Sequence, residues 1–296
     1  MNKIIVITGQ TATGKTKLAL EYAQKINGEL INCDSRQIYK YLDIITGKDY
    51  QLLSKVKIWL LDVVKPNEHF SSFDFVKLAI PVIKKILSKN KTPIIVGGTA
   101  FYLYHFLYNV ASENIPPNWK LRKKFSSKSV KELQTIMRDL DPQSFNRLNN
   151  SEKHNPQRLT RRIEILQSPK KRDSKNQISL YRYNDIKKKL ELSNLSLEFI
   201  GLKFKKRESL QKAIEKRVEE RLKNGAIQEV KKLLKMGYGE NDPGLKTIGY
   251  HQLLLHLKGA INKEEAINQW ISKEIQYAKR QYTFMKKDPN ISWKEI

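Results

Sequence analysis

The eight residues Gly9-Gln10-Thr11-Ala12-Thr13-Gly14-Lys15-Thr16 constrain the fold of this chain more than any other feature. They match the pattern G-x-x-x-x-G-K-[ST], in which glycines let the backbone wrap around a diphosphate and turn successive N–H groups toward it. The apolar, β-branched run Lys3–Thr8 precedes the motif, and a helical pattern over Lys17–Ile26 follows it. Strand, loop and helix in this order are the context that the motif requires, so we expect a P-loop.

Two residues at the end of the loop carry its chemistry. The Lys15 ammonium supplies a point charge to the phosphates, and the Thr16 hydroxyl is suited to ligating the Mg²⁺ that accompanies them. Mg²⁺ is therefore the predicted cofactor. The single cysteine, Cys33, excludes an internal disulfide framework and a cysteine-rich zinc module, and it lies in an apolar run typical of a buried core. A P-loop indicates a diphosphate but does not say that the diphosphate belongs to a nucleotide.

Apolar strand patterns alternate with helical ones along the first part of the chain. Strands are predicted at Glu29–Cys33, Ile58–Val63 and Pro93–Gly98, with a helix over Ser71–Leu87 before the last of them. A strand pattern returns at Glu198–Phe204, and the chain is mostly helical from Arg207 onward. The predicted fold class is α/β: a P-loop NTPase-like parallel sheet flanked by helices, with a mainly helical insertion domain.

The domain boundaries follow from a change of character. Short helical patterns separated by polar, basic stretches replace the strand–helix alternation in the middle of the chain. We therefore predict a P-loop catalytic core formed by residues 1–114 and 192–296, and a helical insertion formed by residues 115–191. Within the insertion, residues 170–176 have the pattern of a loop.

Charge points to the class of partner. Lys and Arg number 56 against 30 Asp and Glu, which gives a formal net charge of +26. Such an excess predicts a polyanion, with nucleic acid first, because contacts from Lys and Arg to phosphates supply most non-specific affinity. A lysine-rich composition without any such partner is the alternative. No apolar run of about 18 residues and no signal-peptide pattern occurs, so we expect a cytoplasmic protein without a membrane partner.

Polar residues follow two of the predicted strands. Asp34 comes directly after Glu29–Cys33, and Thr99 closes the turn that follows Pro93–Gly98. In an open α/β sheet, ligands bind at the carboxyl ends of the strands, where the P-loop also lies. Asp34 is then a candidate general base. The alternative is that Asp34 and Thr99 are helix caps, which are common at strand-to-helix turns.

The insertion carries a basic segment at the start of a helical pattern, Gln157–Arg162. Arg158 and Arg161 are three residues apart and share a helix face, which suits contacts to phosphates or base edges. A solvated basic face with no ligand is equally compatible with this segment.

Taken in order, the segments GQTATGKT, DSRQIY, GGTAFY, QRLTRRIEIL, KTIGYHQ and YAKRQYTF resemble the tRNA dimethylallyltransferase family, from Lys3 to about Lys286. The resemblance implies transfer of a dimethylallyl group from dimethylallyl diphosphate to N6 of the adenine immediately 3′ of the anticodon. This adenine is at position 37, in tRNAs that read codons beginning with U. The resemblance also implies release of diphosphate with Mg²⁺ assistance, and a monomer that binds the anticodon arm of tRNA.

The resemblance further assigns a role to each matching position. Catalysis would involve Asp34, Thr99 and Lys15, with Asp34 accepting the proton of the adenine amine. The diphosphate would be bound by Gly9, Gln10, Thr11, Ala12, Thr13, Gly14, Lys15, Thr16 and Arg217, with Thr16 on the metal. The tRNA would be bound by Asp34, Ser35, Arg36, Gln37, Thr99, Arg122, Gln157, Arg158, Leu159, Thr160, Arg161, Lys246, Thr247, Ile248, Gly249, Tyr250 and His251.

The match has departures, and other classes of protein stay open. Gln10 stands where the family commonly has proline, and Ala213 where it usually has a second arginine. A P-loop kinase with ATP in the loop and Asp34 as its base is one alternative. A non-catalytic RNA-binding module is another. The basic insertion argues against a small-molecule kinase, and Lys15-Thr16 beside Asp34 argues against a module without catalysis.

Overall fold

The computed structural model describes residues 2–48, 50, 54–108, 115–169 and 184–296. The chain divides into two compact units, one formed by Met1–Tyr108 with Tyr181–Ile296 and the other by Asn109–Leu180. The predicted loop at residues 170–176 lies outside the described residues. In the described part of the chain, no helix is long and apolar enough to span a membrane.

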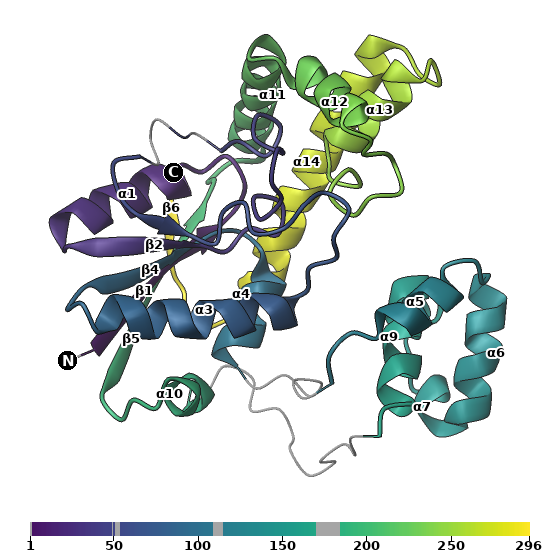
Figure 1. Ribbon diagram of the computed structural model, residues 1–296, viewed down its shortest axis with the longest axis horizontal. Coiled ribbons are helices and arrows are strands. Elements are labelled where there is room, and N and C mark those ends of the chain that lie inside the picture. The colour runs from purple at the N-terminus through teal and green to yellow at the C-terminus, as the bar shows by residue number, and fades with distance from the viewer. Residues whose placement is uncertain (1, 49, 51–53, 109–114, 170–183) are drawn as a thin grey trace. The chain divides into compact units, whose positions relative to one another are not determined.

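A parallel sheet forms the centre of the first unit (Figure 1). Its described strands are β1 (Asn2–Gly9), β2 (Gly28–Asn32), β3 (Ile58–Trp59), β4 (Thr92–Val96), β5 (Leu195–Lys203) and β6 (Ser292–Glu295). They lie in the order β3-β2-β4-β1-β5-β6, and each neighbouring pair is parallel. The predicted α/β fold with a parallel sheet is confirmed, and the strand that leads into the P-loop is paired on both sides.

The helices of the first unit cover both faces of this sheet or lie beyond the ends of its strands. They are α1 (Lys15–Lys25), α3 (Ser72–Leu87), α4 (Ala100–Leu107), α10 (Asn184–Leu190), α11 (Arg207–Lys223), α12 (Ala226–Lys235), α13 (Tyr250–Leu257) and α14 (Lys263–Met285). Ile4 and Val6 of β1 pack into the core with α3 and α4, whereas Ile5 and Ile7 pack with α1. Alternate side chains of a strand face opposite sides, so a continuous apolar run is what a doubly covered strand needs.

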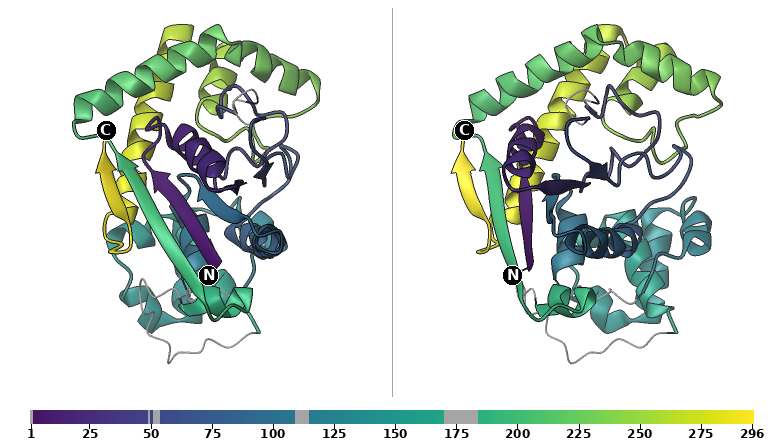
Figure 2. Two further views of the ribbon diagram at one scale, coloured as in Figure 1. Left: turned by 90° about the vertical axis from the view of Figure 1, so that its left-hand side faces the viewer. Right: turned by 60° about the vertical axis from the view of Figure 1, so that its left-hand side comes forward.

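The remaining helices of the first unit form a separate layer. In Figure 2, α11, α12 and α13 gather beyond the carboxyl ends of β1 and β5. Their core contains Ile214, Val230, Tyr250 and Trp270, all at most 1% exposed. Because ligands of α/β sheets bind at the carboxyl ends of the strands, this layer lies over the place where a site is expected.

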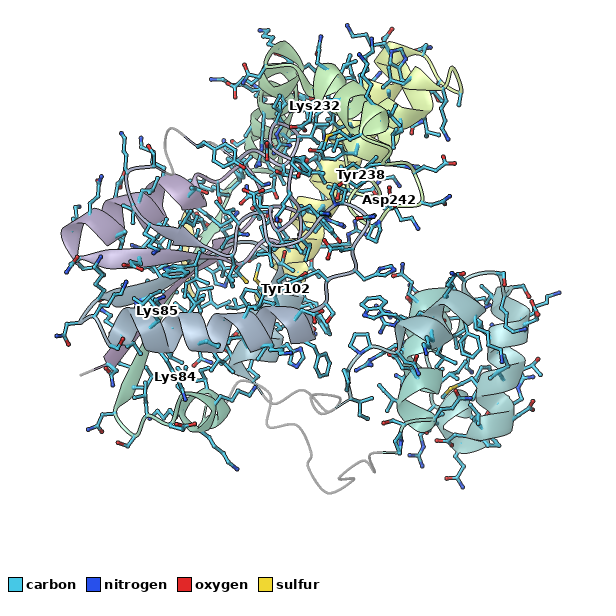
Figure 3. All side chains as sticks on the ribbon, in the orientation of Figure 1. Lys84, Lys85, Tyr102, Lys232, Tyr238 and Asp242 are labelled. Carbon is cyan, nitrogen blue, oxygen red and sulfur yellow. The ribbon has the colours of Figure 1, made fainter. Side chains whose placement is uncertain are left out.

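Helix α3 shows how local sequence sets these elements. Ser71 and Asp74 form a reciprocal capping box at its start, in which the Asp74 carboxylate accepts from the Ser71 N–H at 2.8 Å. Tyr102 of α4, labelled in Figure 3, stacks on Phe75 with ring centroids 5.0 Å apart. Lys84 at the other end of α3 pairs with Glu191 at 3.1 Å, just after α10.

Two elements differ from the sequence prediction. A strand was expected over Ile58–Val63, but β3 ends at Trp59 because Leu60 and Asp62 have φ of 62° and 54°, a left-handed conformation that ends a strand. A helix was expected to run to the C-terminus, but Ser292–Glu295 forms β6. This edge strand is largely exposed and polar, so it carries no apolar alternation from which a strand is predicted.

The second unit is helical, as predicted. Its described helices are α5 (Trp119–Phe125), α6 (Val130–Leu140), α7 (Pro142–Asn146), α8 (Asn150–Lys153) and α9 (Pro156–Leu166). Each begins after a side chain that accepts a backbone N–H from the first turn: Asn118, Ser129, Asp141, Asn149 and Asn155. The unit has its own apolar core, which includes Leu133, Met137 and Ile163, each fully buried.

Two buried charges hold the long segment between β2 and β3, which starts with Asp34. The Glu229 carboxylate accepts from the N–H groups of Asp43 (2.9 Å), Ile44 (2.6 Å) and Ile45 (3.2 Å), and from the Tyr250 hydroxyl (2.5 Å). The Lys48 ammonium, whose side chain is fully buried, donates to Asp43 at 3.0 Å and Asp62 at 2.5 Å. Helix α12 therefore fixes the backbone of a segment almost 200 residues before it.

We predict that Glu229→Ala lowers the free energy of unfolding by about 3 kcal/mol, since it leaves several buried N–H groups without an acceptor. Urea denaturation monitored by circular dichroism measures this change. Glu219→Ala is the matched control, because Glu219 is exposed in the middle of α11 and its loss is expected to cost less than about 0.5 kcal/mol. Equal stability of the two variants would contradict the role assigned to Glu229.

Candidate active site

The P-loop has the backbone that its motif predicts. Gly9 has φ of 127°, and a Cβ at this position would lie 2.1 Å from the Leu202 carbonyl oxygen of β5, so only glycine fits there. Gly14 has φ of 78° and directly precedes the first turn of α1, which begins at Lys15. The N–H groups of that first turn, which have no partner within the helix, are then available to an anion.

Gln10 ties the loop to β5. Its N–H donates to the Leu202 carbonyl at 3.0 Å, and its side-chain oxygen accepts from the Phe204 N–H at 2.8 Å. The side chain is buried. Proline has no N–H to donate, so the glutamine at this position adds two bonds between the loop and the neighbouring strand that proline cannot make.

Lys15 is half-buried and its charge is destabilised. Its ammonium donates to the Gln10 carbonyl, and the Thr13 hydroxyl donates to the same oxygen at 2.8 Å. Burial first, and then the nearby Arg217 guanidinium, lower the pKa of Lys15 to about 7, and the Asp34 carboxylate only partly opposes them. The site therefore holds an excess of positive charge, which an anion in the loop would relieve.

Asp34 lies in a turn that Thr99 holds. One oxygen of the Asp34 carboxylate accepts from the Arg36 N–H at 2.8 Å. The Thr99 hydroxyl accepts from the Ser35 N–H at 2.9 Å and lies 3.3 Å from the Ser35 hydroxyl. The Thr99 side chain does not cap α4, which begins at the next residue. Asp34 thus closes a local turn without capping a described helix, and its carboxylate also lines a pocket.

That pocket brings together parts of the chain that are far apart in the sequence. It is lined by Thr11, Asp34, Arg36, Ile45, Thr46, Arg217, Arg221, Thr247, Ile248, Glu274 and Tyr277. The P-loop, the turn after β2, helix α11 and helix α14 each contribute polar groups to it. Cys33 lies directly beside Asp34, but it is buried, and burial raises the pKa of its thiol well above the usual range, so it is an inert core residue.

Helix α14 contributes residues to which we assigned no role from the sequence. The Gln281 side-chain oxygen accepts from the Thr11 N–H at 2.8 Å, and its nitrogen donates to the Gly98 carbonyl at 2.9 Å. Tyr277 lies one turn earlier, and its burial raises the pKa of its hydroxyl to about 12. Glu274 lies one turn before Tyr277. Their spacing of three and four residues places them on one helix face, which is the sequence signal that could have indicated them. Polar residues at this spacing also occur on exposed helices, so the signal is not specific.

The predicted tRNA-binding residues of the first unit occupy different environments. Thr247 is buried, and its hydroxyl accepts from the Arg36 guanidinium at 3.4 Å. Gly249 has φ of 93°, and Tyr250 is fully buried with its hydroxyl on Glu229. Lys246 and His251 are exposed. The exposed pair is open to a ligand, whereas Gly249 and Tyr250 hold the backbone.

In the second unit, a buried carboxylate collects two of the predicted arginines. Glu164 accepts from Arg122 at 3.0 and 2.8 Å and from Arg161 at 2.5 Å. The Arg161 guanidinium also donates to the Ile115 carbonyl at 2.7 Å. The side chains of both arginines are about a quarter to a third exposed, so Glu164 fixes them at the surface of the unit.

The other predicted residues of α9 differ in exposure. Gln157 and Arg158 are exposed, and Thr160 is half-buried. Leu159 is fully buried in the core of the second unit, so its side chain packs the helix and presents no surface to a ligand.

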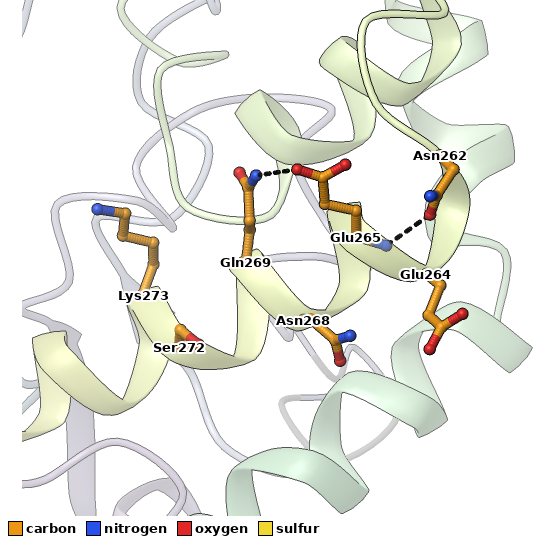
Figure 4. Close-up of a pocket in the computed structure, with 7 residues that line it drawn as sticks. All are labelled: Asn262, Glu264, Glu265, Asn268, Gln269, Ser272 and Lys273. Carbon is orange, nitrogen blue, oxygen red and sulfur yellow. Dashed lines mark hydrogen bonds between the residues drawn. The ribbon is translucent and has the colours of Figure 1, made fainter.

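A wide depression on α14 is not a candidate site. All seven residues that line it come from the first half of this one helix, from Asn262 to Lys273. In Figure 4, Asn262 accepts from the Glu265 N–H at 2.8 Å, and Gln269 donates to the Glu265 carboxylate at 3.2 Å. These groups bond to one another along one exposed face, and none belongs to a predicted motif.

A parallel sheet with a P-loop after its β1 strand, and a pocket where arginine side chains outnumber carboxylates, define a P-loop protein of the α/β class. The particular family follows from comparison with known proteins. The IPP transferase family model matches residues 37–288, and the chain belongs to this family.

Its relatives match over almost the whole chain. The tRNA dimethylallyltransferase of Acetivibrio thermocellus is 37% identical over 99% of this chain and 91% of its own. That of Clostridioides difficile is 34% identical, with 99% and 91% covered.

Solved structures agree. The tRNA isopentenylpyrophosphate transferase of Bacillus halodurans superposes with a TM-score of 0.70 at 30% identity, covering 100% of this chain and 90% of that one. A eukaryotic dimethylallyltransferase acting on tRNA gives 0.75 at 25% identity, covering 100% of this chain and 74% of that one.

The lowered pKa of Lys15 predicts that inorganic diphosphate binds with uptake of a proton. Above pH 7, Lys15 in the ligand-free protein is mostly neutral, and an anion beside it raises its pKa, so affinity falls as pH rises. At pH 8 we expect roughly 0.9 proton to be taken up. Calorimetry in two buffers of different ionisation enthalpy counts these protons. Lys15→Met corrects for protons taken up by diphosphate itself, and equal uptake by both proteins would contradict the assignment.

Proposed function

We propose that this chain transfers a dimethylallyl group from dimethylallyl diphosphate to N6 of adenine 37 in tRNAs that read codons beginning with U. The observation that carries the proposal is that one pocket holds both the Asp34 carboxylate and the cationic groups beside the P-loop. A base for the adenine amine and a binding site for the leaving diphosphate are then adjacent, as the transfer requires. The names of the relatives support tRNA as the acceptor and dimethylallyl as the group that is transferred.

The leaving group is stabilised by fixed positive charge. As the carbon–oxygen bond of the allylic diphosphate breaks, negative charge grows on the diphosphate, and Lys15 and Arg217 are placed to neutralise it. Gln281 holds the Thr11 backbone and so keeps the loop in shape before the substrate arrives. Charges that are already in position do not have to reorganise during the reaction.

Asp34 accepts the proton that the adenine amine loses as the new carbon–nitrogen bond forms. The bond to the Arg36 N–H uses one oxygen of its carboxylate and orients the group. The other oxygen takes the proton in this proposal. Thr99 positions the turn through its bond to the Ser35 N–H. The adenine has to leave its stack to reach this pocket, at a cost of about a few kcal/mol that contacts to the RNA backbone offset.

Mg²⁺ fits the residues present as an ion that the diphosphate brings with it. Among the described residues, no group of three or more His, Cys, Asp and Glu side chains is placed to hold a metal, whereas Thr16 follows Lys15 in the first turn of α1. Mg²⁺ commonly uses one or two protein oxygens and completes its shell with phosphates and water. When bound, it adds charge neutralisation on the diphosphate.

The polyanionic partner in this proposal is the anticodon arm of tRNA, bound by a monomer in the cytoplasm. The net charge of +26 and the exposed Arg158, Lys246 and His251 support a nucleic-acid partner. Membership in the IPP transferase family favours this function over a P-loop kinase and over a module without catalysis.

The direct test is to incubate the purified chain with unmodified tRNA and dimethylallyl diphosphate and to analyse the digested nucleosides by mass spectrometry. We expect N6-(dimethylallyl)adenosine in tRNAs that read codons beginning with U, and none in tRNAs without adenine at position 37. A parallel incubation with ATP and candidate small molecules tests the kinase alternative. Phosphorylated product without prenylated nucleoside would overturn the proposal.

The variant Asp34→Asn distinguishes the role of Asp34 as a general base from its role in forming the turn. Asparagine keeps the bond to the Arg36 N–H, so stability should change by at most a few tenths of a kcal/mol. It does not take a proton, so single-turnover prenyl transfer at saturating substrates should fall by about 10²-fold or more. A thermal melt and a tRNA-binding measurement on the same variant control for folding. Transfer at the wild-type rate by a folded variant would remove Asp34 from the mechanism.

A further inference from the structure

A second arginine of α11 shares the pocket with Arg217. Arg221 follows one turn later, and both side chains line the pocket that contains Asp34 and Thr11. A Cβ added at Gly47 would lie 2.9 Å from Nη2 of Arg217 and 2.9 Å from Nη2 of Arg221. The two guanidinium groups therefore reach the same point beside Gly47, where a φ of 74° favours glycine.

Arg221 is held from behind by a carboxylate. Its Nη1 donates to Glu274 of α14 at 3.0 Å, and the indole N–H of Trp270 points at the same oxygen from 3.3 Å. The side chains of Arg221 and Glu274 are only 7% and 11% exposed. Nη1 is thus committed to Glu274, whereas Nη2 is directed toward Arg217.

The charges of this arrangement do not balance. Glu274 compensates one guanidinium, but Arg217 lies close enough to Arg221 and to Lys15 to disfavour the charge of each. Burial and then Arg217 lower the pKa of Arg221 to about 10, and Arg217 also lowers that of Lys15. Keeping like charges together in a buried place costs free energy unless an anion lies between them.

We propose that Arg221 is a second arginine that binds the diphosphate, and that Glu274 positions its guanidinium for this contact. The proposal rests on the proposed function, because it takes the ligand to be an allylic diphosphate. The ligand class follows from the site itself: two guanidinium groups and a P-loop lysine suit a group with several oxygens and more than one negative charge. Ala213, on the same face of α11 one turn before Arg217, has no charge to contribute.

The alternative is that Arg221 and Glu274 only hold α11 against α14. A buried ion pair of this kind often contributes little to stability, and removing one partner is destabilising because the other charge stays buried alone. The two readings differ in what happens when both partners are neutralised. If the pair is only structural, diphosphate affinity is retained when both partners are neutral. If Arg221 contacts the diphosphate, the affinity is lost.

The test uses the full chain with Arg221→Met, and the double variant Arg221→Met with Glu274→Gln. The double variant leaves no unpaired buried charge and keeps an acceptor for Trp270, so it remains informative if the single variant folds poorly. Calorimetry measures the Kd for inorganic diphosphate, and steady-state kinetics measure the KM for each substrate. We expect the Kd and the KM for dimethylallyl diphosphate to rise about 10- to 100-fold in both variants, with the KM for tRNA unchanged.

Lys216→Met is the matched control, since it removes one positive charge from an exposed position of α11. It is expected to bind diphosphate like the wild type. Wild-type diphosphate affinity in the double variant would overturn the inference and leave the proposed function intact. If diphosphate binding depends on Arg221 but the protein transfers no prenyl group, the inference stands and the proposed function is overturned. Wild-type diphosphate affinity in Glu274→Gln alone would overturn the positioning role of Glu274.

Discussion

Positive charge buried without an equal negative charge is the constraint on which the rest of this structure depends. Lys15, Arg217 and Arg221 converge beside the P-loop, and only Asp34 and Glu274 oppose them in the pocket. Such a cluster is unfavourable in a protein that binds nothing, because desolvation and like charges both act against it. In the proposed function, a bound diphosphate makes the cluster favourable. The fold therefore holds these like charges together before a ligand binds. Rigid surroundings are needed to keep them in place against their mutual repulsion.

Those surroundings come from buried polar contacts between distant parts of the chain. Glu229 fixes the backbone at Asp43–Ile45, and Gln281 fixes Thr11 and Gly98. Each of these side chains bonds to more than one backbone group in the loops that it contacts. Loops held in this way can be irregular and still precise, which suits a site built at the ends of strands. In the second unit, the Glu164 carboxylate holds the side chains of Arg122 and Arg161 in place.

Much of the fold was predictable because each element carries its own signal. β1 and β4 are continuous apolar runs, and the P-loop is recognised from eight residues in one stretch. Prediction failed where the deciding factor is not local. β3 stops at Trp59 because Leu60 and Asp62 adopt a left-handed backbone, and the exposed strand β6 exists only because β5 offers it an edge.

The sequence by itself determined the position of the P-loop and the family, because the glycine spacing and the other motifs are carried by short continuous segments. Only the tertiary structure decided which further side chains line the pocket beside the P-loop. Nothing near Arg221 in the sequence distinguishes it from the exposed Lys216 or Lys223 of the same helix. Its partner Glu274 lies 53 residues away, and their meeting depends on how α11 packs against α14. Burial turns an ordinary charged residue into a functional one, and burial is a property of the folded chain.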